Sequence, residues 1–192
     1  MLRRLLDKLR GPKHQGLELG GDDCAQVFAK ARAEADGGAA SASTHNRVAI
    51  VSPSGGLLFI PAPLPESVSE AQIARSRNLL PPEPRRTVAV IADTRVSGSL
   101  AEINKTIPFV GMLVGLAYIG HCVTVFDGQL SRIEPGCRDA DILIVDGALL
   151  PHLHHDWYAT ARRSMRSPGI YVHDRKTYAL RPVLSNPKAV AK

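Results

Sequence analysis

The feature that most constrains this chain is a set of three short, predominantly apolar runs that are each followed by an aspartate. The runs and their acids are residues 88–92 before Asp93, residues 122–126 before Asp127, and residues 142–145 before Asp146. Such runs, without alternation of polar and apolar residues, are typical of parallel strands buried on both faces. Strands that alternate with predicted helices imply a parallel sheet with right-handed crossovers.

The rest of the sequence divides into four segments. We assign residues 1–46 to a basic amphipathic helix, a second helix and a linker, residues 47–86 to a hairpin, a short helix and a Pro-rich spacer, residues 87–184 to the α/β domain, and residues 185–192 to a loose tail. The expected fold is therefore α/β, a three-layer sandwich with a mostly parallel sheet behind an N-terminal extension.

Turn and capping signals place the individual elements. The expected helices are 22–35 (N-capped by Asp22 or Asp23), 67–80 (capping box Ser67 and Glu70), 99–119 (capping box Ser99 and Glu102) and 153–166. The expected additional strands are 47–51, 57–60 and 170–172, with 178–180 as a fifth parallel strand or an edge hairpin partner.

The positive charge of the chain is concentrated at its beginning. The formal net charge is +6, from 24 Lys+Arg and 18 Asp+Glu, and residues 1–13 hold five of the basic residues against Asp7 alone. Their apolar residues recur at helical spacing: Leu2, Leu5, Leu6 and Leu9. This helix is predicted to dock on a partner or peripherally on an anionic membrane, or else to be a frayed helix end. Nucleic acid is not expected to bind the folded domain, since aromatic residues make up only 5%.

Residues 107–126 contain no charged side chain other than His121, and Gly111 and Gly115 form a GxxxG pair. The segment is long enough to span a bilayer, but Pro108 and the glycines favour a helix followed by a buried strand. A helix this apolar must be covered on more than one side, by the sheet and N-terminal elements or by another subunit. We therefore expect Gly111 and Gly115 at a close helix interface.

Acids at the ends of parallel strands suggest a site, because ligands bind at the carboxyl edge of such sheets. Asp93 and Asp146 are the candidate catalytic residues and the candidate ligands of a divalent cation. Asp127 precedes Gly128, and ordinary turn chemistry explains it better. The strand-end acids at 93 and 146 are open to the same structural explanation.

The stretch 87–151 resembles the first half of a response-regulator receiver domain. VAVIAD (88–93) is similar to that family's first strand with its acidic end, GHCVTVFDG (120–128) to the second strand, and DADILIVDGALLP (139–151) to the third strand with its phospho-accepting aspartate. The resemblance implies a flavodoxin-like fold, Asp146 as phospho-acceptor and Asp93 as a metal-binding acid. It also implies a cytoplasmic, bacterial regulatory protein. Paired acids on the first strand, the switch Ser/Thr after the fourth and the Lys-Pro after the fifth are missing, which favours a degenerate receiver.

PHLHHDW (151–157) gathers imidazoles and a carboxylate, the chemistry of zinc sites. It resembles the HxHxDH motif of the metallo-β-lactamase fold, with Trp157 at the place of the last histidine, and only 35 residues follow it. The candidates for a weak surface metal site are His152, His154, His155 and Asp156.

The loop after residues 88–92 is a candidate anion or nucleotide site, because hydroxyls and backbone N–H groups gather at a helix start. Its residues are Arg95, Ser97, Gly98 and Ser99, although capping alone explains Ser99. The basic run at 162–166, with Arg175 and Lys176, is a phosphate-facing patch or, as we prefer, a solvated face. Cys24, Cys122 and Cys137 form no CxxC pair and are expected to be buried.

These observations predict a non-catalytic regulatory or assembly module that works through a protein partner or a homo-oligomer. Two alternatives remain: a divalent-cation-dependent enzyme or phospho-switch acting on phosphate or nucleotide through Asp93 and Asp146, and a membrane-associated protein using residues 1–10 or 107–126. We expect a cytoplasmic or membrane-peripheral location. Whether the chain is an enzyme stays open, with a non-enzyme favoured.

Overall fold

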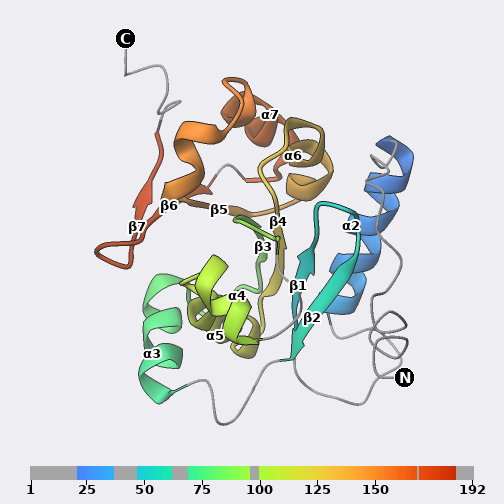
Figure 1. Ribbon diagram of the computed structural model, residues 1–192. Helices are drawn as coiled ribbons and strands as arrows, with labels where there is room; N and C mark the ends of the chain where they lie inside the picture. The colour runs from blue at the N-terminus through green and yellow to red at the C-terminus, as the bar shows by residue number, and fades with distance from the viewer. Residues whose placement is uncertain (1–20, 37–46, 62–68, 96–99, 168, 185–192) are drawn as a thin grey trace, which may run out of the picture.

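A seven-stranded mixed sheet runs through the chain in the order β2-β1-β4-β3-β5-β6-β7. The computed structural model describes residues 21–36, 47–61, 69–95, 100–167 and 169–184 (Figure 1). The strands are β1 (Arg47–Val51), β2 (Leu57–Pro61), β3 (Thr87–Ile91), β4 (Cys122–Phe126), β5 (Ile142–Asp146), β6 (Gly169–Asp174) and β7 (Ala179–Pro182). Strands β1, β4, β3, β5 and β6 are parallel, and the edge strands β2 and β7 are antiparallel to their neighbours. The predicted α/β class with a mostly parallel sheet is confirmed.

Helices cover both faces of this sheet. They are α2 (Gly21–Ala35), α3 (Glu70–Leu79), α4 (Leu100–Thr106), α5 (Val110–Tyr118), α6 (Leu130–Cys137), the 3-10 helix η1 (Gly147–His152) and α7 (Trp157–Ser164). Buried side chains of α2, α6 and α7 pack on one face, and those of α4 and α5 pack on the other. Figure 1 shows α3 beside α5, on the side away from α6 and α7.

The central strands β3, β4 and β5 are largely apolar because helices cover both faces of the sheet. In β3, Ala89 and Ile91 pack with α2, α6 and α7, while Val88 and Val90 pack with α4 and α5. All four residues are at most 1% exposed. This is the burial that the continuous apolar runs predicted. Strands β1 and β2, which come before the Pro-rich spacer, belong to the same sheet, since β1 pairs with β4.

The predicted helix over 99–119 is two helices, α4 and α5. Pro108 lies between them, and it has no backbone N–H to continue a helical ladder and disfavours helical geometry at Ile107. After α5 the chain reaches Gly120, whose φ of 110° suits glycine, and then enters β4. Within the described residues, no helix combines the length and apolarity needed to cross a bilayer. A single span over 107–126 is therefore wrong, because its helix ends at Tyr118 and its last five residues form β4.

Four further expectations need correction. The capping box of α3 is made by Ser69 and Gln72, not by Ser67 and Glu70. Helix α2 begins at Gly21, so Asp22 and Asp23 lie inside it. The helix predicted over 153–166 is the shorter α7, which is preceded by η1. Helix α6 was missed, since Pro135 and Gly136 within it read as helix breakers.

Strand β7 pairs antiparallel with β6, which decides between the two interpretations of 178–180 in favour of the edge hairpin. The hairpin β1–β2 and burial of all three cysteines are confirmed. The following predicted features lie outside the described residues: Leu2, Leu5, Leu6, Leu9, Ser97, Gly98, Ser99, the linker 37–46 and the tail 185–192.

Candidate functional site

The parallel strands bring their acidic ends to one edge of the sheet. Asp127 follows β4, Asp93 follows β3, and Asp146 ends β5, and these three strands are adjacent in the order β4-β3-β5. The topology therefore places the predicted acids on neighbouring strands, as the sequence suggested. What their carboxylates can do depends on the groups that bind them.

Asp146 is completely buried and is held by Arg175. The guanidinium Nε donates to Oδ1 at 2.9 Å and to Oδ2 at 3.2 Å, and Nη2 also donates to Oδ2. The backbone N–H of Ala148 donates to Oδ1 at 3.1 Å, so the carboxylate also caps η1. The bond to Asp146 raises the pKa of Arg175. Both carboxylate oxygens are thus engaged by donors from the protein itself.

Asp93 is bound in a similar way by Arg95, two residues later. Nε of Arg95 donates to Oδ1 at 2.9 Å and Nη2 to Oδ2 at 2.7 Å, and the Arg95 backbone N–H adds a bond of 3.1 Å to Oδ1. These bonds hold the pKa of Asp93 below its usual value. Arg95 was predicted to bind an anion with the following loop. Within the described residues, the guanidinium of Arg95 is instead directed to the Asp93 carboxylate.

Asp127 has a structural role, as its Asp-Gly context suggested. Its Oδ1 accepts the backbone N–H of Gln129 at 3.0 Å, which forms the turn into α6. The guanidinium of Arg132 lies 3.1 Å from Oδ2 but donates to the carbonyls of Ser52 and Pro53 in the β1–β2 turn. Burial raises the pKa of Asp127. Arg132, only 5% exposed, thereby joins α6 to the ends of β1 and β4.

These contacts bear on the predicted cation site. A divalent cation needs carboxylate oxygens that are free to coordinate it. At Asp93 and Asp146, bidentate arginines occupy those oxygens. Among the described residues, no group of three or more possible metal ligands forms at this edge. The acids at this edge therefore do not fit a divalent cation as they stand.

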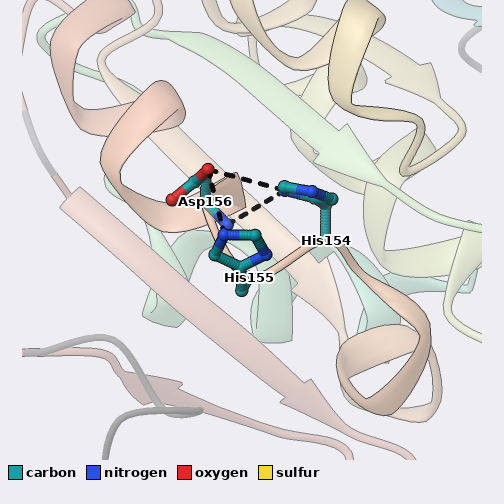
Figure 2. Close-up of side chains that lie close together, drawn as sticks. All are labelled: His154, His155 and Asp156. Atoms are coloured by element: carbon teal, nitrogen blue, oxygen red, sulfur yellow. Dashed lines mark hydrogen bonds and ion pairs between the residues drawn. The ribbon is translucent and has the colours of Figure 1, made fainter.

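The one such group in the described chain is His154, His155 and Asp156 (Figure 2). His155 Nε2 lies 3.3 Å and His154 Nδ1 3.8 Å from Asp156 Oδ2, and the imidazole rings are 4.1 Å apart. His154 Nδ1 already accepts the backbone N–H of Asp156 at 3.2 Å. All three side chains are exposed, and His152 is not in the group. The cluster is an open feature of the surface.

Sequence reasoning missed two residues that shape the carboxyl edge. Arg175 was grouped with a basic patch, and nothing in its spacing from Asp146 indicated their ion pair. His173 lies opposite Asp146 in the β5–β6 register, is 1% exposed, and stacks on Phe109 with ring centroids 4.2 Å apart. Burial lowers the pKa of His173. The only available sequence signal for His173 was its position directly after the predicted strand 170–172.

Comparisons with protein-family models, with curated proteins and with solved structures found no match.

Proposed function

We propose that this chain is a non-catalytic regulatory module with a degenerate receiver-like core, acting through contacts with a protein partner or a second copy of itself. The observation that carries the proposal is the buried ion pair between Asp146 and Arg175. A phospho-accepting aspartate must offer an oxygen to the phosphorus atom and another to a cation. Arg175 and the Ala148 N–H occupy the oxygens of Asp146 instead.

The strand order supports the receiver-like part of the proposal. Counted from β3, the strands β4-β3-β5-β6 follow the order 2-1-3-4, which matches the start of a flavodoxin-like sheet. The chain departs from that pattern at both ends. The β1–β2 hairpin extends the sheet beside β4, and the antiparallel β7 stands where a fifth parallel strand would come. A core of this kind with a neutralised acidic edge is suited to a scaffolding role.

Phosphoryl transfer to the full chain tests this proposal. Incubation with acetyl phosphate and Mg²⁺ is expected to leave the intact mass and the melting temperature unchanged. The matched variant Asp146→Asn should behave in the same way. A phosphoryl adduct in the wild-type chain that is lost in Asp146→Asn would instead establish a phospho-switch or a phosphate-handling enzyme.

A second pair of variants tests whether the ion pair is structural. Arg175→Gln leaves a buried charge unpaired and should lower the free energy of unfolding by about 2 kcal/mol, less than for a wholly buried pair because Arg175 is partly exposed. Adding Asp146→Asn should recover most of that loss.

Sedimentation velocity tests the proposed contacts with a protein partner or a second copy. A chain that stays monomeric and captures no partner contradicts this part of the proposal.

A further inference from the structure

A cavity of about 440 Å³ lies between α3, the α4–α5 segment and the β6–β7 turn. Its volume falls in the range of small-molecule sites. Its lining residues come from three elements distant in sequence, and Figure 1 shows the β6–β7 turn above α3. The predicted functions make no use of it, and none of the acids at the carboxyl edge lines it.

The cavity wall is apolar and partly aromatic. Phe109, Val110 and Val114 line it and are each at most 3% exposed. The His173 ring stacks on Phe109 and meets the Tyr178 ring edge-on, with centroids 5.9 Å apart. These side chains form an aromatic surface that suits a flat, ring-containing molecule.

The rim of the cavity also carries exposed hydrophobic side chains. Three large hydrophobic side chains are exposed in the described part of the chain, and two of them, Leu79 and Tyr178, line this cavity. Tyr178 has a φ of 54°, the left-handed region that a bulky residue rarely occupies. The turn therefore places an aromatic side chain in water beside an apolar hollow, an arrangement found at ligand sites.

The polar residues that line the cavity favour a negatively charged ligand. Gln72, Asn78 and Asn104 line it together with Arg75, and no acidic residue of the described chain does. No carboxylate of the described residues lies within ion-pairing distance of Arg75. Among the described residues, Arg75 thus has no acidic partner, and it lies at the edge of an apolar cavity, where it is available for a charge-assisted hydrogen bond.

We propose that this cavity binds a small organic anion with a flat apolar body, such as an aromatic carboxylate, with the anionic group on Arg75 and the ring against Phe109 and Tyr178. The site is separate from Asp146 and Arg175, so it extends the regulatory role without depending on the ion pair.

Two fluorescent probes that differ by one charged group test the proposal in the full chain. Anilinonaphthalene sulfonate carries an anion on an aromatic body, and phenylnaphthylamine has the same rings without the sulfonate. Both should bind saturably at one site, the sulfonate more tightly. Arg75→Gln should weaken sulfonate binding about tenfold, the value of one charge-assisted hydrogen bond, and leave the neutral probe unaffected.

Exposed positions on the same elements supply the controls. Arg77 lies on α3 outside the cavity, so Arg77→Gln should bind both probes as the wild type does. Asn104→Trp should fill the space and abolish binding of both. Because Arg75, Arg77 and Asn104 are exposed, each variant should keep the near-UV circular dichroism and cooperative melting of the wild type.

Three results would overturn the proposal. The first is sulfonate binding that falls equally, or not at all, in Arg75→Gln and Arg77→Gln. The second is binding that survives Asn104→Trp, which would place the probe elsewhere. The third is binding that arises only after residues 185–192 are deleted, which would assign the cavity to the chain's own end. None of these results depends on phosphoryl transfer to Asp146, so the two proposals can fail separately.

Discussion

Asp93 and Asp127 end neighbouring strands, yet their pKa values shift in opposite directions. The Arg95 guanidinium stabilises the charged form of Asp93, and burial of Asp127 disfavours its charged form more than Gln129 and Arg132 favour it. The comparison explains why a strand ending in Asp does not by itself predict a site. The group that reaches the carboxylate decides its chemistry.

Two buried histidines predict the response of stability to pH. His121 and His173 are at most 1% exposed, and burial lowers the pKa of each from the ordinary 6.5. His121 Nδ1 accepts the Arg86 backbone N–H at 3.1 Å, a bond that a protonated Nδ1 could not accept. Below pH 6.5 the unfolded chain therefore binds more protons than the folded chain. The free energy of unfolding should fall by up to ~1.4 kcal/mol per pH unit for each histidine.

The variant His173→Phe keeps a ring against Phe109 and removes one of the two groups. Urea unfolding at a series of pH values from neutral to about pH 5 should show a slope roughly half that of the wild type. The exposed His152→Phe is the control and should keep the full slope. An unchanged slope in His173→Phe would mean that Asp146 and Asp174, which favour the charged imidazole, offset its burial.

At the scale of elements, the contact between α3 and α5 depends on two glycines. A Cβ on Gly115 would lie 2.2 Å from Ser76 Oγ and 3.1 Å from Ser76 Cβ, and a Cβ on Gly111 would lie 2.4 Å from Gln72 Nε2. Ser76 is completely buried and donates to the carbonyl of Gln72 at 2.9 Å, so it cannot move easily. The close helix approach expected at this GxxxG face is made by α3 of the same chain.

The substitutions Gly115→Ala and Gly111→Ala form a matched pair for this contact. Both gain the same helix propensity, about 1 kcal/mol. The clash with the short Ser76 side chain should exceed this gain, so Gly115→Ala should lower the free energy of unfolding by about 1 kcal/mol. Gly111→Ala should be neutral or slightly stabilising, because the end of Gln72 can rotate away. Equal effects in denaturant unfolding would contradict this account of the packing.

At the scale of the whole molecule, two-thirds of the formal charge belongs to residues 1–13. Of the net +6, these residues contribute five basic groups less one acid, or +4, which leaves +2 for the rest. Charge near an anionic bilayer is worth about 1 kcal/mol for each Lys or Arg. The folded sheet with its paired acids therefore contributes little to any electrostatic attraction.

Vesicle sedimentation measures this directly. The full chain is expected to sediment with vesicles containing phosphatidylserine at low salt and to be released by high salt. It should not sediment with neutral vesicles. Deletion of residues 1–13 should abolish the association and keep the melting temperature of the fold. Replacing Leu2, Leu5, Leu6 and Leu9 by serine separates insertion of an apolar face from attraction by charge alone. Equal sedimentation of the full and the shortened chain would place any membrane contact elsewhere.

The sequence by itself determined the parallel strands, their acidic ends and the helix face at Gly111 and Gly115. Each of these features depends on residues that are close together in the sequence. Burial on two faces requires an uninterrupted apolar run, and close helix contact requires small residues four apart. Even so, local signals misplaced the cap of α3 and missed α6, whose Pro135 and Gly136 are tolerated where Gly136 packs on the Phe126 ring.

Only the tertiary structure decided which cation binds each acid and where a cavity forms. Asp146 and Arg175 are 29 residues apart, and they meet because β5 and β6 are adjacent and parallel. The cavity likewise needs α3, α5 and the β6–β7 turn together. Ion pairs and cavities are set by strand order and helix placement, and neither spacing nor residue type along the chain encodes distances between elements that are remote in sequence.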